Sequence, residues 1–496
     1  MIMKKHNYIF FIVLLFISAA CNKLDENPIG VLAPESFFRN KADAEASIMG
    51  AYASMVNIDD YGARYFYLSE PPSDLTIAPY DASLIEISSF DNDPNEMTTG
   101  KWWIAVYKII GAANNAISGI PNIKESDEVK NRLMAEAMAI RAHTYFRLVR
   151  IYGDVPYLGE FVNDPATVKD ITRTPVAEIY QHIINDLEFA IQHLPNSYSG
   201  DTRSRVTKGT AYTILADVYL TLKEWGKAAE NAEYVINHAT DFGYGLVDDF
   251  KDLFDASLNH LKENIWICDF SFVNNSYPYD YNYLGALFSV SGSDYGGWST
   301  FTSNVATLNS FDNRDYRKKI SFLTEAPYKG VIKNYTEFGW PLPHINKWYG
   351  SLIGTSQEIG YPTDLNVNVY RYAEVLLIAS EALNEINSGP TAKAYDYINQ
   401  VRARARNYGG TMTNFPADLQ PGMSQEEFFD AVMEERRVEL AFECKRWFDI
   451  CRRNLFEKVF AGPNSTEPHT TWQKLLPIPQ SEIDINPNLT QNPDYN

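Results

Sequence analysis

Residues 209–242 read GTAYTILADVYLTLKEWGKAAENAEYVINHATDF, and this stretch decides the fold class of the chain. Small and apolar residues recur three or four positions apart on both sides of the Trp225-Gly226 pair. Such spacing places side chains on one face of an α-helix. The pattern therefore predicts two helices, with Trp225-Gly226 marking the turn between them.

The same segment matches the spacing of a known repeat. Leu215, Ala216, Tyr219, Ala228 and Ala232 fit the helix–turn–helix pattern of a tetratricopeptide repeat, although Ala232 is small where the repeat often has an aromatic residue. One repeat cannot bury its own apolar face, so several helix pairs must stack. The predicted fold class is mainly α, with tetratricopeptide-like helix pairs stacked as a scaffold and long irregular loops attached to it.

Further helices are indicated by the same periodicity and by turn residues at their ends. One ends before Gly153 and Pro156, and the next begins at a Thr174 cap with Pro175 in its first position. The predicted helices cover residues 129–150, 174–194, 371–385, 393–405 and 425–453. We expect the helical scaffold to span about 102–240 and 367–455.

Two stretches without sustained periodicity, about 57–101 and 240–366, are expected to form ligand-binding loops. They are rich in Gly, Pro, Asn, Asp and Tyr, and loops of this length in a compact domain are usually functional. In the second stretch, alternation would place Tyr277, Tyr279, Tyr281 and Tyr283 on one face if the segment is a strand. The Pro- and Asn-rich tail, LLPIPQSEIDINPNLTQNPDY, should lie extended on the body.

Composition indicates what kind of ligand these loops could bind. The chain contains 32 Tyr, 27 Phe and 9 Trp, and its net charge is −20. Exposed flat rings bind sugar faces by dispersion while their polar tips stay hydrated. A surface this acidic repels phosphate backbones, so nucleic acid is not an expected partner.

We expect ligand contacts from aromatic residues of these loops and from nearby carboxylates, because a sugar site needs stacking rings and hydrogen-bonding groups. For each ring the alternative is that it packs its own loop against the body. Trp103 and Tyr107, by contrast, are expected on the buried face of a helix. The predicted ligand-binding residues are Trp298, Tyr295, Tyr277, Tyr279, Tyr281, Tyr80, Asp74, Asp81 and Trp102.

The N-terminus has the layout of an export signal over residues 1–20. Lys4 and Lys5 precede an apolar run, and Ser18, Ala19 and Ala20 precede Cys21. The apolar run spans about 18 Å as a helix, against the ~30 Å of a hydrocarbon core, so it is too short to cross a membrane. Cys21 resembles the lipidated cysteine of a lipobox, although Ser18 departs from the usual aliphatic residue. The alternative is ordinary secretion with an incidental cysteine.

The NKLDEN that follows Cys21 resembles the surface-export signals of some lipoproteins. Residues 21–496 are then expected to form a single domain.

Sequence motifs give no catalytic residue, metal site or cofactor. The histidines lack metal-binding spacing, and no nucleophile elbow or phosphate-binding loop occurs. The DNDPNE run from Asp91 lacks the Gly and the acid of a calcium loop, which favours a helix-capping role. In EERRVELAFECKRWFD, charges at helical spacing indicate a structural role. The remaining cysteines, Cys268, Cys444 and Cys451, are expected to be buried.

Several blocks, in this order, resemble the SusD/RagB family of outer-membrane lipoproteins. They are WWIAVYKIIGAANNAI, AEAMAIRAHTYFRLVRIYGDVPYL, RTPVAEIYQHIINDLEFAI, RVTKGTAYTILADVYLTLKEWGKAAENAEYVI, NVYRYAEVLLIASEALNEIN, NQVRARA, EERRVELAFECKRWFDICRR and LLPIPQSEIDINPNLTQNPDY. One departure is Cys444 in FECKRWFD, where the family often has Gly.

The resemblance implies a single SusD-like domain that binds a nutrient glycan without cleaving it. It also implies a SusC-like TonB-dependent barrel as partner, and a lipid-anchored location on the outer membrane facing the cell exterior. Two alternatives remain. One is a peptide-capturing protein of the RagB kind, and the other is a tetratricopeptide scaffold that recruits proteins.

Overall fold

The computed structural model describes residues 37–200, 203–270, 282–348, 363, 365–460, 474–493 and 495, and the protein is mainly helical, as predicted. Tyr277, Tyr279, Tyr281 and Cys21 lie outside the described residues. None of the helices within the described ranges combines the length and apolar character that crossing a bilayer requires.

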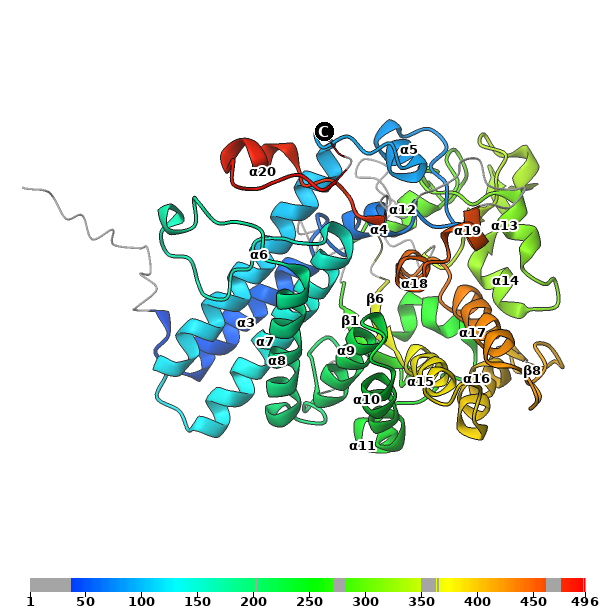
Figure 1. Ribbon diagram of the computed structural model, residues 1–496. Coiled ribbons are helices and arrows are strands. Elements are labelled where there is room, and N and C mark those ends of the chain that lie inside the picture. The colour runs from blue at the N-terminus through cyan, green and yellow to red at the C-terminus, as the bar shows by residue number, and fades with distance from the viewer. Residues whose placement is uncertain are drawn as a thin grey trace, which may run out of the picture.

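The scaffold is a continuous series of packed helices (Figure 1). Each helix packs against the next: α3 against α6, α6 against α7, and so on through α8, α9, α10 and α15 to α16 and α17. These helices are α3 (Lys41–Met55), α6 (Met97–Gly119), α7 (Asp127–Tyr152), α8 (Val176–His193), α9 (Lys208–Thr221), α10 (Trp225–Asn237), α15 (Tyr372–Ile386), α16 (Ala392–Ala405) and α17 (Gln425–Glu439).

The order of packing shows how the two halves of the scaffold join. Helix α10 packs against α15, although more than a hundred residues separate them in the sequence. The intervening stretch therefore leaves the helical series after α10 and returns at α15. The irregular region is an insertion into a scaffold that is continuous in space.

The predicted helix pair at 209–242 is present as α9 and α10. Thr207 and Thr210 form a capping box at the start of α9. The turn lies at residues 222–224, before the predicted pair, because Lys223 adopts a left-handed conformation (φ 61°) and Trp225 already begins α10. The placement of Trp225-Gly226 in the turn was therefore wrong, whereas the pair of helices was correct.

Helices α7 and α8 agree with prediction except at one cap. Helix α7 ends at Gly153, whose φ of 74° suits a residue without a Cβ. At the start of α8, Pro175 rather than Thr174 is the cap residue and has no side-chain cap bond. The Asp154 carboxylate instead accepts a hydrogen bond from the Val176 N–H at 2.7 Å.

The long helix predicted at 425–453 is two helices, α17 and α18 (Arg446–Arg453), which corrects the sequence prediction. Phe442 and Cys444 between them adopt left-handed conformations, with φ of 63° and 59°. Helical spacing of the charges continues through this break, so periodicity alone could not reveal it. The α17 charges that precede the break, Glu435, Arg436 and Glu439, are buried.

A buried ion network explains the charged run. Arg371 contacts Glu263, Glu439 and Glu443, with its Nε 2.8 Å from a Glu443 oxygen. Glu439 also accepts hydrogen bonds from Arg317 and Arg404. All of these side chains are buried. The charged residues join α17 to distant segments, which confirms their structural role.

The two stretches predicted as loops contain short elements rather than only coil. The first includes α4 (Arg64–Ser69) and α5 (Ala82–Ser89). The second includes α11 (Ala239–Phe242), α12 (Leu284–Phe288), α13 (Val305–Ser310) and α14 (Tyr316–Ser321), with 3-10 turns at Phe250–Phe254, Ala256–Leu258 and Tyr335–Glu337. Tyr283 precedes α12 and lies in no strand, contrary to the alternation argument.

The strands form four two-stranded antiparallel pairs among the described residues. The pairs are β1 (Asn264–Cys268) with β6 (Val367–Arg371), β2 (Phe322–Leu323) with β5 (His344–Ile345), β3 (Glu325–Tyr328) with β4 (Val331–Asn334), and β7 (Asn407–Tyr408) with β8 (Thr411–Met412). The first pair lies beside the scaffold and the second and third support the irregular region.

The C-terminal tail lies on the end of α7, as expected for a segment docked on the body. The Leu476 N–H donates to the Ile151 carbonyl at 2.8 Å, and Asn492 donates to the Tyr152 carbonyl at 2.9 Å. The tail is not extended throughout, because Gln480–Ile485 forms the short helix α20. Helix α19 (Phe456–Phe460) precedes it in the chain.

Candidate functional site

Three segments far apart in the sequence join to form one loop surface. Ile77 and Thr302 exchange backbone hydrogen bonds of 2.8 and 2.9 Å, which link the first irregular stretch to the second. The Ser303 hydroxyl donates to the Leu75 carbonyl at 2.6 Å, and the Ser303 N–H donates to the Pro343 carbonyl at 2.8 Å. Residues 75–80, 298–303 and 340–343 are thus held together.

Four aromatic residues of this surface form two ring stacks, which we name the aromatic platform: Tyr80, Tyr283, Trp298 and Trp340. Tyr80 stacks on Trp340 with ring centroids 5.3 Å apart, and Tyr283 stacks on Trp298 at 5.5 Å. The exposed fractions are 42% for Tyr80, 37% for Trp298 and 38% for Trp340. These rings are therefore accessible to a ligand and at the same time braced by a neighbour.

The hydroxyl of Tyr80 joins the two stacks. It donates to the backbone carbonyl of Trp298 at 2.5 Å and lies 3.3 Å from the Thr300 hydroxyl. Tyr80 therefore contacts Trp340 through its ring and the Trp298 backbone through its tip. The two stacks consequently belong to one continuous surface rather than to separate patches.

Glycine chemistry explains how the Trp298 loop reaches this position. A Cβ at Gly297 would lie 2.1 Å from the Ser289 carbonyl carbon, so only glycine permits this close approach. The Trp298 N–H then donates to the Ala286 carbonyl at 2.7 Å. Gly297 therefore allows the backbone contact that fixes the loop just before Trp298.

The structure brings together two of the residues predicted from the sequence, Trp298 and Tyr80, and adds Trp340 and Tyr283. Trp340 has the same local signal as Trp298, since Gly339 precedes it and Pro341 follows it. An aromatic residue between turn formers could therefore have been selected at both positions. The stacking partners themselves could not be predicted, because they come from different segments.

Trp102 does not belong to the site, which corrects the sequence prediction. Its side chain is fully buried, and its indole N–H donates to Asp60 at 2.9 Å. The same carboxylate pairs with the buried Arg147 at 2.6 Å. Trp102 and its neighbour Trp103 both contact Tyr152, at the end of α7, in the core. A buried ring cannot stack on a sugar.

Asp74 and Tyr295 support the loops from other directions. The Asp74 carboxylate faces α18, where Arg446 donates to it at 2.7 and 3.0 Å. Burial alone would raise the pKa of Asp74, but the charge and hydrogen bonds of Arg446 outweigh it and lower that pKa. Tyr295 packs, half-buried, against a small apolar cluster around Phe338.

Asp81 is the carboxylate nearest to the platform in sequence, directly after Tyr80. It is partly exposed and accepts a hydrogen bond from the Leu84 N–H at 3.3 Å, which caps α5. One of its oxygens serves the helix, and the other can accept a hydrogen bond from a ligand hydroxyl. Ligand binding by Asp81 stays a prediction.

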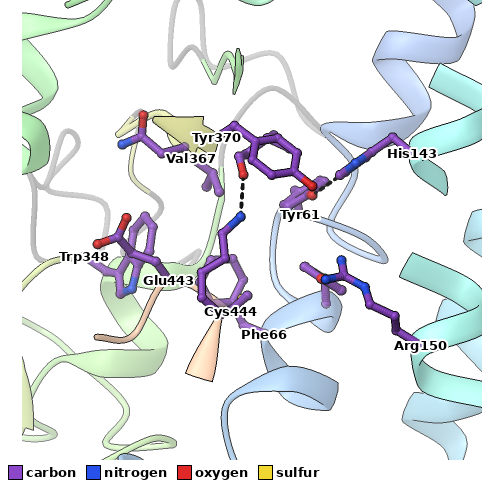
Figure 2. Close-up of a pocket in the computed structure, with 13 residues that line it drawn as sticks. Tyr61, Phe66, His143, Arg150, Trp348, Val367, Tyr370, Glu443 and Cys444 are labelled. Atoms are coloured by element: carbon purple, nitrogen blue, oxygen red, sulfur yellow. Dashed lines mark hydrogen bonds between the residues drawn. The ribbon is translucent and has the colours of Figure 1, made fainter. Parts of the chain in front are cut away.

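Three other hollows differ from the platform in size or chemistry. Figure 2 shows residues that line an internal cavity, with the Tyr61–His143 hydrogen bond dashed. The volume of this cavity is about 10 Å³, and that hydrogen bond is 2.9 Å long. This cavity is only large enough for a water molecule. A hollow of about 520 Å³ beside Asp74 has charged walls, and an apolar groove of about 740 Å³ lies between α6 and α20.

The platform is suited to binding rather than to proton or metal chemistry. Its four residues are neutral rings with hydroxyl or indole N–H tips, which contribute dispersion contacts and hydrogen bonds. Within the described ranges, no group of three His, Cys, Asp or Glu residues gathers to hold a metal ion. The acidic run near Asp93 instead precedes α6, which Glu96 caps by accepting the Thr99 N–H at 2.9 Å.

Family models match both halves of the chain. Residues 316–495 match the SusD family, and residues 32–220 match a family described as starch-binding and associating with the outer membrane. SusD-like protein P2 of Formosa agariphila is 38% identical, over 99% of this chain and 100% of its own length. The starch-binding protein SusD of Bacteroides thetaiotaomicron is 21% identical over 97% of this chain and 96% of its own.

Solved structures share the fold along nearly the whole chain. A SusD homolog from Bacteroides thetaiotaomicron superposes with a TM-score of 0.79 at 24% identity, covering 93% of this chain and 98% of that one. A laminarin-binding SusD-like protein gives 0.76 at 23% identity, covering 92% and 100%. Together with the full-length match to the Formosa relative, these findings show that the chain belongs to the SusD/RagB family.

Proposed function

We propose that this protein binds a nutrient glycan on the aromatic platform and delivers it to a SusC-like TonB-dependent barrel in the outer membrane. The observation that carries the proposal is the pair of accessible ring stacks joined by the Tyr80 hydroxyl. Two neighbouring ring stacks suit an oligosaccharide, because successive sugar faces can stack on successive rings.

Features of the platform favour a glycan over the alternatives. A peptide would need partners for its charged groups, whereas all four platform residues are neutral. A scaffold that only recruits proteins has no requirement for accessible rings braced in pairs. Among the structural neighbours, one binds laminarin and another, surface glycan-binding protein A of Bacteroides thetaiotaomicron, is in complex with laminarihexaose. Laminarin oligosaccharides are therefore the first ligands to test, followed by starch oligosaccharides.

Delivery and location rest on family membership and on the predicted leader. The matched family associates with the outer membrane, and Cys21 would carry the lipid that anchors the chain there, facing the exterior. A tethered binder only concentrates its ligand, so import requires a channel and an energy source. A TonB-dependent barrel would supply both.

Calorimetric titration of the purified protein with a glycan panel tests the proposal. For a glycan that binds, Trp298→Ala should weaken binding by about 1–2 kcal/mol, the size of one aromatic contact with its buried area, and leave the melting temperature nearly unchanged. Trp225→Ala is the matched control, because Trp225 is a half-exposed tryptophan on α10 and outside the platform. It should bind like wild type.

A core comparison completes the design. Trp102→Ala should cost ~3–5 kcal/mol of folding stability, as truncation of a buried Trp does. Chromatography of the incubated glycan should detect no shorter products, since binding without turnover is proposed. Equal affinity of Trp298→Ala and wild type, or cleavage of the glycan, would contradict the proposal.

A further inference from the structure

His344 lies beneath the platform and contacts both segments that carry its tryptophans. Its side chain is fully buried, and its ring packs edge-on against Phe338 with centroids 5.5 Å apart. Its backbone is fixed by β5, where His344 pairs with Leu323 of β2. The β5 backbone and the Phe338 ring therefore fix the position of the imidazole, and its two nitrogens make defined hydrogen bonds.

The hydrogen-bond partners determine which nitrogen carries the proton. Nδ1 lies 2.9 Å from the Leu342 carbonyl oxygen, which can only accept, so Nδ1 must be protonated. Nε2 lies 2.8 Å from the Ser299 hydroxyl. In the neutral ring Nε2 is an acceptor, so the Ser299 hydroxyl donates a hydrogen bond to Nε2 of His344. The Ser299 oxygen in turn accepts the Ser291 N–H at 2.8 Å.

Neutral imidazole is the form that this environment favours. Burial lowers the pKa of His344 to about 4, against a smaller opposing contribution from the Leu342 carbonyl. Ser299 itself adopts a left-handed conformation, with φ of 55°, which is uncommon for a residue with a Cβ. The loop at Ser299 therefore needs an external constraint, and its hydrogen bond to His344 provides one.

Both partners of His344 stand next to platform tryptophans. Ser299 directly follows Trp298, and Leu342 lies two residues after Trp340. Two hydrogen bonds of the His344 ring therefore connect the loop of one stack with the loop of the other. One is made to the Leu342 carbonyl and the other to the Ser299 hydroxyl. The Tyr80 hydroxyl joins the stacks from the exposed side, and His344 joins them from below.

We propose that His344 is a positioning residue, whose two hydrogen bonds set the relative placement of Trp298 and Trp340 and so the glycan geometry that the platform accepts. This inference rests on the proposed function of the platform. His344 does not touch the ligand; it acts through Ser299 and Leu342.

Two substitutions separate the hydrogen bonds from the volume of the ring. His344→Gln retains an N–H donor for Leu342 and a carbonyl acceptor for Ser299, whereas His344→Phe fills the same space and provides neither. We expect His344→Phe to weaken glycan binding roughly tenfold, as loss of about 1.4 kcal/mol does, and His344→Gln to restore most of it. Equal affinities of His344→Phe and wild type would overturn the inference.

Loss of stability alone must be distinguished from loss of positioning. Leu377→Ala, at a buried position of α15 and outside the platform, is a control for destabilisation and should bind normally where it is folded. In a double-mutant cycle, His344→Phe should add little to the affinity loss of Trp298→Ala, because both act on the same contact. Fully additive losses, or a failure of His344→Gln to restore binding, would contradict the proposal.

Two measurements without glycan keep this inference separate from the proposed function. Acrylamide should quench tryptophan fluorescence differently in His344→Phe and wild type, and the difference should vanish when Trp298 and Trp340 are both replaced by Phe. The imidazole ¹⁵N signals that disappear in His344→Gln should show Nδ1 protonated and Nε2 unprotonated. If no glycan binds wild type but the quenching difference and the Nδ1-protonated tautomer are both found, the proposed function fails and the positioning role of His344 stands. The opposite tautomer or unchanged quenching would overturn the positioning role.

Discussion

Glu70 is a buried carboxyl group at the junction of the first irregular stretch and the break between α17 and α18. One of its oxygens accepts the Cys444 N–H at 2.6 Å, and the other accepts the Thr76 hydroxyl at 3.3 Å. Burial raises the pKa of Glu70 to about 7, despite the opposing effect of these hydrogen bonds. Its charge therefore changes in the neutral range.

The raised pKa gives a stability prediction with a defined sign. The unfolded chain binds the Glu70 proton less tightly, so the contribution of Glu70 to stability is complete below its usual pKa of 4.5 and is lost as pH rises to about 7. Glu70→Gln keeps one acceptor for Cys444 and cannot ionise. As pH rises from 4.5 to 7, the unfolding free energy of the variant should increase relative to that of wild type by on the order of 2 kcal/mol. Denaturant unfolding at a series of pH values measures this change. A difference that does not change with pH would refute this.

Cys444 shows why the family pattern often has glycine at this position. A close approach to another backbone would be one reason for that preference. The structure instead gives Cys444 a φ of 59°, a conformation that glycine adopts without steric cost, and its N–H is fixed by Glu70. The cysteine is accommodated because its small side chain lies buried in the main apolar core.

At the scale of elements, the break between α17 and α18 is the feature on which the ion network depends. Glu439, the last residue of α17, contacts Arg371, Arg317 and Arg404. Glu443, within the break, also contacts Arg371. Burial alone would raise the pKa of Glu439, but the charges of Arg404, Arg371 and Arg317 lower it well below 4.5. Three cations share this carboxylate, so it is central to the junction of the helices with β6 and α14.

Removing that charge should destabilise the fold strongly. Glu439→Gln leaves buried guanidinium groups uncompensated, and we expect a loss of about 3–5 kcal/mol in unfolding free energy at neutral pH. Because the pKa of Glu439 is lowered on folding, wild type should lose this contribution as pH falls below 4.5, and the variant should lose less. Denaturant unfolding between pH 3 and 7 measures both effects.

Glu434→Gln is the matched control on the same helix. Glu434 pairs with Arg437, but its side chain is 56% exposed, and surface pairs of this kind contribute little. Its unfolding free energy should stay close to wild type across this pH range. A comparable loss in the two variants would show that the network, despite its burial, does not stabilise the junction.

At the scale of the whole molecule, anchoring and partnership can be tested together. Cys21→Ala should release the protein from membranes without unfolding it, because two acyl chains anchor stably and the tether adds little to the core. Wild-type protein captured from a mild-detergent extract should bring a TonB-dependent barrel with it. The interface should exceed the ~1,000 Å² of a specific contact, since the ligand would be enclosed between both proteins.

Membrane fractionation tests the lipid anchor, and pull-down tests the barrel partnership. Cys21→Ala that still sediments with the outer membrane, with no acyl label on wild type, would refute the lipid anchor. Wild type recovered alone from the extract would refute the barrel partnership. Trp298→Ala should still capture the barrel, because that substitution affects ligand contact and not the proposed interface.

The sequence determined the scaffold because helix formation depends mainly on residues close together in the chain. Helix periodicity and the stop at Gly153 act within a few residues, so the sequence correctly predicted the pairs α9–α10 and α15–α16 together with α7. It also indicated Trp298 and Tyr80, because turn formers next to an aromatic residue are visible in one segment. The sequence failed at the α17–α18 break, where charges keep helical spacing although the backbone turns.

Contacts between distant segments decided the rest. Trp102 is buried because α6 is covered by α7 and the residues around Asp60, which no local pattern records. Tyr80 meets Trp340 across 260 positions because residues 75–80 pair with the strand-like segment around Thr302. Hydrogen bonds such as Ser299 to His344 join side chains whose sequence neighbours show no common pattern. The sequence therefore determined most of the elements, and only tertiary packing determined which rings stack together in the platform.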